Sequence, residues 1–169
     1  MTATAEVSGN TVVQFEVPPV IKEVLLPCSC AAAFDVFTAQ IHQWWPMASY
    51  SLGGADTVGV TIEPRRGGRV FERHADGSEH LWGSVTTWEN PNRMAFTWHV
   101  GRSSEQAQSV EVTFVPAATG TRVRLVHSGW ESLAANAQSM RDQYNKGWEL
   151  VFVRCYADSA RAAGSSEKP

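Results

Sequence analysis

The sequence has little cysteine, no excess of basic charge and no long apolar run. Its 169 residues include three cysteines, at positions 28, 30 and 155. An odd number of cysteines argues against a disulfide framework and is typical of a reducing compartment. No apolar stretch approaches the roughly 18 residues that a membrane-spanning helix needs. The first residues, MTATAEVSGN, also lack the basic and apolar regions of a secretory signal, so we expect a cytoplasmic protein without a membrane span.

The charge balance argues against nucleic-acid binding. The chain carries 14 basic and 17 acidic residues, a net charge of −3, whereas proteins that bind nucleic acids usually have a basic excess. The one basic cluster, RRGGR at 65–69, lacks the GxxxxGK[ST] pattern of a phosphate-binding loop. We interpret this cluster as a turn that leads into a strand, and we expect no nucleic-acid partner.

Metal and nucleophile motifs are missing as well. CSC at 28–30 has the spacing of some metal sites, but no second pair of ligands matches it, and the five histidines are scattered. No Ser-His-Asp or Cys-His arrangement can be ordered into a catalytic motif. We therefore expect no metal and no cofactor, and the sequence favours a role other than catalysis.

The alternation of apolar and polar residues predicts a single domain with an antiparallel sheet. We place this domain at 20–162, after a flexible or edge-forming leader at 1–19 and before a flexible tail at 163–169. Its strands are joined by short turns, of which Asp76-Gly77 is the clearest hairpin signal, and such connections pair strands antiparallel. The predicted strands are 20–26, 58–64, 69–73, 80–88, 94–100, 108–116 and 121–128.

Helical spacing appears in two regions. Between Ser29 and Pro46, apolar residues recur every three or four positions and predict two short helices. The stretch 138–162 predicts one long amphipathic helix, whose apolar face includes Trp148 and Phe152. One helix cannot fill the concave face of a seven-stranded sheet, so a pocket is expected near the open end.

The order of these segments resembles a known family. The resemblance rests on AAAFDVFT with IHQWWP, EPRRGGRVFER with DGSEHLWGSVTTWENPNRMAFTWH, VEVTFVP with GTRVRLVHSGW, and YNKGWELV, which together cover 20–160. These segments are similar to the START-like, or SRPBCC, superfamily, whose helix-grip fold is that of the birch-pollen allergen. Within it, they resemble the branch named after the activator of heat-shock protein 90 ATPase. The resemblance implies an α+β fold with a curved antiparallel sheet of six or seven strands, two short helices after the first strand and a long C-terminal helix. It also implies a hydrophobic cavity between sheet and helix.

The adjacent tryptophans in IHQWWPM point to that cavity. Neighbours on a helix lie about 100° apart, so Trp44 and Trp45 rarely share one position in a core. We expect one of them to pack beneath the helices and the other to line the cavity. The alternative is that both only fill the core and its rim.

Strand alternation predicts which polar side chains point inward. His127 shares a face with Val123 and Leu125, and Glu72 shares a face with Val70. An inward carboxylate and histidine could form an acid/base or ligand-orienting pair; the alternative is two ordinary buried polar groups. His74 and His80, beside the hairpin turn, are expected to be solvated. The expected ligand-binding residues are Trp45, Phe71, Glu72, Trp82, Trp98, His127, Tyr144 and Trp148, with Glu72 and His127 as the candidates for catalysis.

Three functions are consistent with these observations. The first is a small-molecule binding protein with an apolar or aromatic ligand in an internal hydrophobic cavity. The second, implied by the resemblance, is an interaction module similar to the heat-shock protein 90 ATPase activator, with a chaperone as partner. The third is a cyclase or aromatase type of enzyme that uses Glu72 and His127. The sequence leaves the identity of the ligand and the possibility of a homodimer open.

Overall fold

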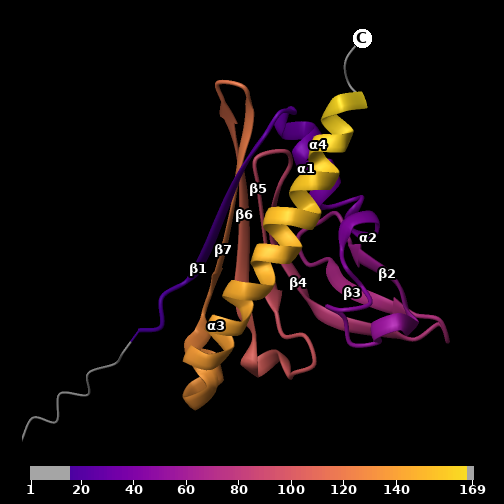
Figure 1. The fold of residues 1–169 in the computed structure, drawn as a ribbon. Coiled ribbons are helices and arrows are strands. Elements are labelled where there is room, and N and C mark those ends of the chain that lie inside the picture. Colours follow the sequence, from indigo (N-terminus) through magenta and orange to yellow (C-terminus); the bar gives the residue numbers. More distant parts are fainter. Residues whose placement is uncertain (1–15, 167–169) are drawn as a thin grey trace, which may run out of the picture.

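The computed structural model describes residues 16–166 and shows a curved seven-stranded antiparallel sheet with a helix across its concave face (Figure 1). The spatial order of the strands is β1-β7-β6-β5-β4-β3-β2, and all neighbours are antiparallel. The predicted helix-grip fold is therefore confirmed. The leader predicted at 1–19 lies mostly outside the described residues. The strands are β1 (Val20–Leu26), β2 (Thr57–Ile62), β3 (Arg69–His74), β4 (Glu79–Glu89), β5 (Arg93–Trp98), β6 (Gln108–Ala117) and β7 (Gly120–Ser128).

Two short helices, α1 (Cys30–Phe37) and α2 (Ile41–Trp44), connect β1 to β2 as the apolar spacing predicts. Ser29 caps α1, because its hydroxyl accepts a hydrogen bond of 3.1 Å from the backbone N–H of Ala32. The chain then leaves α2 at Trp45, and Pro46 prevents the helix from continuing. This turn places the following loop beside the C-terminal helix.

The C-terminal helix has three parts: α3 (Ala137–Trp148), the π-helical segment η4 (Glu149–Tyr156) and α4 (Ala157–Ser166). The single regular α-helix predicted at 138–162 is thus corrected in two respects. Its middle has π geometry, and its end lies at Ser166 rather than at 162. In this last part Gly164 lies close to the β1–α1 junction, where an added Cβ would come within 3.1 Å of the Pro27 carbonyl oxygen. The last three positions, 167–169, lie outside the described residues.

The concave face of the sheet and the inner face of this helix form the core. Trp148 and Phe152, predicted to face inward, are 2% and 0% exposed. The Phe152 ring stacks on that of Tyr156 at 5.3 Å between centroids and meets Phe37 of α1 edge to face. Helix, sheet and α1 therefore share one hydrophobic core. Among the described residues, no helix combines the length and the apolar character needed to cross a bilayer.

Polar side chains of the C-terminal helix contact β1 and the two residues before it. Arg141 donates to the carbonyl oxygens of Pro18 and Pro19, each at 3.2 Å, just before the strand begins. Lys22 of β1 forms an ion pair of 3.0 Å with Glu149. The start of β1 is thus tied to the C-terminal helix.

Candidate functional site

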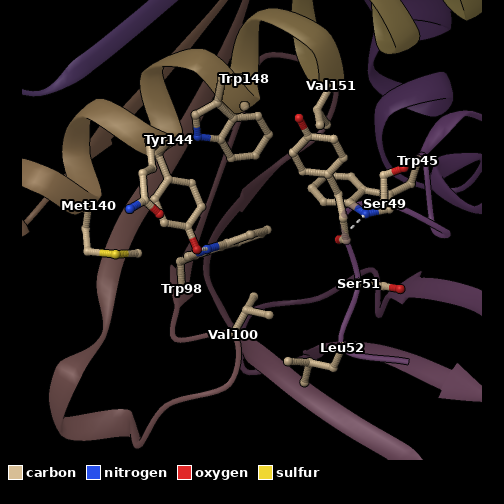
Figure 2. A pocket seen from close by; sticks show the side chains of 13 residues that line it. Trp45, Ser49, Ser51, Leu52, Trp98, Val100, Met140, Tyr144, Trp148 and Val151 are labelled. Atoms are coloured by element: carbon tan, nitrogen blue, oxygen red, sulfur yellow. Dashed lines mark hydrogen bonds between the residues drawn. The ribbon is translucent and has the colours of Figure 1, made fainter. Parts of the chain in front are cut away.

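A pocket of about 280 Å³ opens between the first half of the C-terminal helix, the end of β5 and the loop that follows α2 (Figure 2). This volume lies near the lower end of the usual range for ligand pockets, roughly 300–1,000 Å³. It suits a compact ring system better than a long lipid chain. The lining residues are Trp45, Ser49, Tyr50, Ser51, Leu52, Trp98, Val100, Met140, Gln143, Tyr144, Gly147, Trp148 and Val151.

The two adjacent tryptophans separate as expected. Trp44 packs between Phe37 and Tyr156 beneath the helices, and its indole N–H donates to the Val36 carbonyl at 2.7 Å. Trp45 turns the other way and lines the pocket, where its indole N–H donates to the Tyr50 carbonyl at 2.9 Å. Because Trp45 follows the last residue of α2, the turn out of the helix aims its ring at the pocket.

Four of the eight predicted ligand-binding residues form the aromatic wall. The Trp45 ring lies 5.9 Å from both the Trp98 and the Trp148 ring, and the Tyr144 ring lies 6.3 Å from that of Trp98 (Figure 2). These four side chains come from the end of α2, from β5 and from α3. Residues more than 40 positions apart in the sequence thus meet as one surface of aromatic rings.

The other four predicted residues do not line the pocket. Trp82 is fully buried behind Trp45, with 4.9 Å between their centroids. Phe71 lies on the convex face of β3, where the guanidinium carbon of Arg69 stands 4.3 Å from its ring centroid. Phe71 and Glu72 are consecutive in a strand, so they point to opposite faces and cannot both reach the concave side.

The Tyr144 hydroxyl is the polar group of the wall. It accepts a hydrogen bond of 2.9 Å from the Trp98 indole N–H. Within residues 16–166, its own proton has no acceptor, which leaves one O–H donor for a ligand. Burial raises the pKa of Tyr144, so this hydroxyl keeps its proton at neutral pH.

His127 lies behind this wall and is completely buried. Its Nδ1 accepts a hydrogen bond of 3.0 Å from the Trp148 indole N–H, so the neutral ring carries its proton on Nε2. Nε2 has no partner among the described residues. Burial lowers the pKa of His127 from 6.5 to about 3, and the ring is neutral at physiological pH.

Glu72 holds the loop that forms the far side of the pocket. Its carboxylate accepts the backbone N–H groups of Leu52 at 3.0 Å and Gly53 at 2.9 Å, together with the Trp82 indole N–H at 2.7 Å. Burial raises the pKa of Glu72, but hydrogen bonds from His74, the two amides and Trp82 outweigh burial and hold this pKa below its usual value. The charged carboxylate is therefore a fixed anchor for the loop.

His74 and His80, expected to be solvated, are partly buried, and both rings make contacts within the chain. The His74 ring is 2.5 Å from the Glu72 carboxylate and stacks on the His80 ring at 4.1 Å between centroids. The position of His74 also explains a glycine in the loop, because a Cβ at Gly53 would come within 2.6 Å of the His74 Nε2. The hairpin of β3 and β4 and the pocket loop are thus packed directly together.

Comparisons with known proteins agree with this architecture. The family model described as "Activator of Hsp90 ATPase homolog 1-like protein" matches residues 27–154, about three quarters of the chain. The chain belongs to this family. The comparison with curated proteins gave no match.

Solved structures of related folds extend this result. The anthrahydroquino-γ-pyrone synthase Txn09, solved in complex with a ligand, is 31% identical; the alignment covers 85% of this chain and 97% of Txn09, with a TM-score of 0.57. The AHSA1-like protein from Aeromonas hydrophila is 21% identical over 89% of this chain and 97% of its own, with a TM-score of 0.63. Protein MLL2253 from Mesorhizobium loti is 16% identical over 89% of this chain and 99% of its own, with a TM-score of 0.62. At these identities, the last two show the fold alone.

In this member of the activator-like family, Glu72 and His127 do not form an acid/base pair. Strands β4, β5 and β6 lie between β3, which carries Glu72, and β7, which carries His127. Each side chain is engaged by different tryptophans, Trp82 for Glu72 and Trp148 for His127. Within the described part of the chain, no three His, Cys, Asp or Glu side chains are grouped to hold a metal ion.

Replacing Glu72 by glutamine should loosen the pocket loop. A glutamine side chain has one acceptor oxygen and turns an NH2 group toward N–H donors, so at least one of the Leu52 and Gly53 amides loses its acceptor. We expect the free energy of unfolding to fall by about 1–3 kcal/mol. We also expect faster hydrogen exchange at the Leu52 and Gly53 amides. Glu79→Gln is the matched control, since Glu79 is an exposed carboxylate that pairs with Arg69. Equal exchange rates in wild type and Glu72→Gln would contradict the anchoring role.

Proposed function

We propose that this protein binds a flat, oxygen-bearing aromatic molecule in the pocket beside Trp45, Trp98, Tyr144 and Trp148. The observation that carries this proposal is the aromatic wall with one free O–H donor in it. Aromatic walls gain contact area from flat rings, and the few polar groups of such a pocket set ligand orientation. The Tyr144 O–H fits a carbonyl or phenol oxygen on the ligand.

The relationship to Txn09 supports the same ligand class. Txn09 is named as an anthrahydroquino-γ-pyrone synthase, a name that describes a fused, oxygen-rich aromatic product. This relative is 31% identical to the chain over most of both sequences. The ligand chemistry suggested by the relative and the chemistry of the pocket wall therefore agree.

A hydroxyanthraquinone such as alizarin tests the proposal. We expect alizarin to quench tryptophan fluorescence saturably and to raise the melting temperature, because it binds only the folded chain. Tyr144→Phe keeps the ring but removes the O–H, and it should weaken binding roughly 2- to 10-fold. The control is Phe71→Leu on the convex face, which should leave the affinity unchanged. Quenching that does not saturate, with no change in melting temperature, would remove the proposal.

Catalysis on such a ligand is a second candidate, which the synthase relative favours. In this candidate Tyr144 stabilises negative charge on a carbonyl oxygen by donating its hydrogen bond. Glu72 and His127, the pair expected from the sequence, are not part of it. Turnover of the Txn09 substrate by this chain, with kcat lowered in Tyr144→Phe, would support it. A chaperone as partner rests on the family name and stays a prediction.

A further inference from the structure

A half-buried arginine stands at the side of the pocket formed by the β5–β6 connection. Arg102 lies in the loop between β5 and β6, and its Nη2 is 3.3 Å from the sulfur of Met140, which lines the pocket. The loop is fixed locally, because the Arg102 backbone N–H donates to the His99 carbonyl at 2.8 Å. The His99 Nδ1 in turn lies 3.1 Å from the Arg102 carbonyl oxygen. The backbone at Arg102 is therefore held in place, and its guanidinium contacts the Met140 sulfur.

Arg102 has no carboxylate partner among residues 16–166. Most other arginines of the described chain form ion pairs with glutamate or aspartate, as Arg69 does with Glu63 and Glu79. A thioether is a weak hydrogen-bond acceptor and carries no charge, so it does not neutralise a guanidinium. The positive charge at this side of the pocket thus remains uncompensated.

The rest of the pocket has no negative charge. None of its thirteen lining residues is aspartate or glutamate. The Tyr144 hydroxyl, with its unused proton, is close enough to feel the charge of Arg102, which opposes the effect of burial on the Tyr144 pKa. Arg102 is not one of the thirteen lining residues, but its guanidinium contacts Met140, which is one of them. A cation beside the pocket wall and an O–H donor within that wall both favour a negatively charged oxygen group.

We propose that the ligand of this pocket carries an anionic oxygen group, such as a carboxylate, sulfonate or phenolate, that pairs with Arg102. The aromatic body of the ligand lies against Trp98 and Trp148, and the anionic group points toward Arg102 and the Tyr144 hydroxyl. This inference rests on the proposed function and specifies it further. The competing explanation is that the Arg102 stem only packs on Met140, with its head in water.

Two fluorescent probes with the same rings separate these explanations. Anilinonaphthalene sulfonate carries an anionic group, and phenyl naphthylamine has the same aromatic framework without it. Both brighten when they enter an apolar pocket, so each dissociation constant can be measured by titration. We expect wild type to prefer the sulfonate by about tenfold, and we expect higher salt to reduce this preference.

Substitutions at Arg102 should change only the preference for the charged probe over the uncharged one. Arg102→Gln should remove the preference for the sulfonate and leave the affinity for phenyl naphthylamine unchanged, whereas Arg102→Lys should retain most of the preference. The matched control is Arg124→Gln, since Arg124 is an exposed arginine of β7 that also lacks an ion pair among the described residues.

Each outcome has a distinct meaning. If both probes bind and Arg102→Gln weakens them equally, Arg102 acts by packing and the anion proposal fails, while the proposed function stands. If Arg124→Gln removes the preference as well, the effect is one of overall charge, and the anion proposal again fails. If neither probe nor alizarin binds the wild-type protein, the anion proposal and the proposed function both fail.

Discussion

Acidification from pH 7 to pH 4 should destabilise the folded protein by about 3 kcal/mol through His127 alone. The unfolded chain binds a proton at this histidine below about pH 6.5, whereas the folded chain binds it only below about pH 3. Between these values the unfolded state carries the extra proton, so stability is fully present above pH 6.5 and falls as the pH drops toward 3. The rings around His127 belong to Trp98, Trp130, Tyr144 and Trp148, none of which offers a charge to stabilise an imidazolium.

Urea denaturation at pH 7 and pH 4 measures this loss. Carboxyl groups of the unfolded chain also take up protons over this range. The informative quantity is therefore the difference between wild type and His127→Gln. Glutamine keeps an acceptor for the Trp148 indole N–H but does not titrate. Between pH 7 and pH 4, the free energy of unfolding of the variant should fall by about 3 kcal/mol less than that of wild type. The same pH dependence in both proteins would mean that His127 does not carry the effect.

Truncating the core face of the C-terminal helix should have an effect of similar size. Trp148→Ala and Phe152→Ala each remove a large ring that is almost fully buried. Each substitution should lower the free energy of unfolding by about 3–5 kcal/mol. Trp148→Ala also removes the hydrogen bond to the buried His127 Nδ1. Phe152→Ala instead opens a cavity against Tyr156 and Phe37.

Chemical denaturation at constant pH checks these values, and Leu150→Ala provides the comparison within the same helix. Leu150 is 36% exposed, so its truncation should cost less than about 1 kcal/mol. Losses below about 1 kcal/mol at both Trp148 and Phe152 would show that the other face of the helix carries the packing.

Periodicity in the sequence was sufficient to place the strands and helices, and four of the eight predicted ligand-binding residues line the pocket. Alternation located the seven strands and the inward direction of Glu72 and His127, because both follow from a period of two. Helical spacing located Tyr144 and Trp148 on the pocket side of α3. The same spacing, extended to Met140 and Val151, would have found two further lining residues, since these positions continue the same stripe.

The pocket loop could not be predicted from the sequence. Residues 49–53 have no periodicity, and their position depends on a carboxylate that is about 20 residues further along the chain. The role of Glu72 was missed for the same reason, because alternation gives the direction of a side chain but not the donors that it meets. Arg102 likewise lies in an irregular connection, where its distance from Met140 follows only from the fold.

The contacts at the start of β1 have a consequence for how this protein associates with itself. An exposed edge strand can pair with the same strand of a second molecule and extend the sheet, which leads to dimers or aggregates. Here Arg141 already binds the carbonyl oxygens at the start of β1, and the Lys22–Glu149 ion pair ties the strand to the helix. A second strand that paired as far back as Pro18 would have to displace Arg141 from the Pro18 and Pro19 carbonyl oxygens. A homodimer that extended the sheet through β1 would therefore be opposed at the start of this strand.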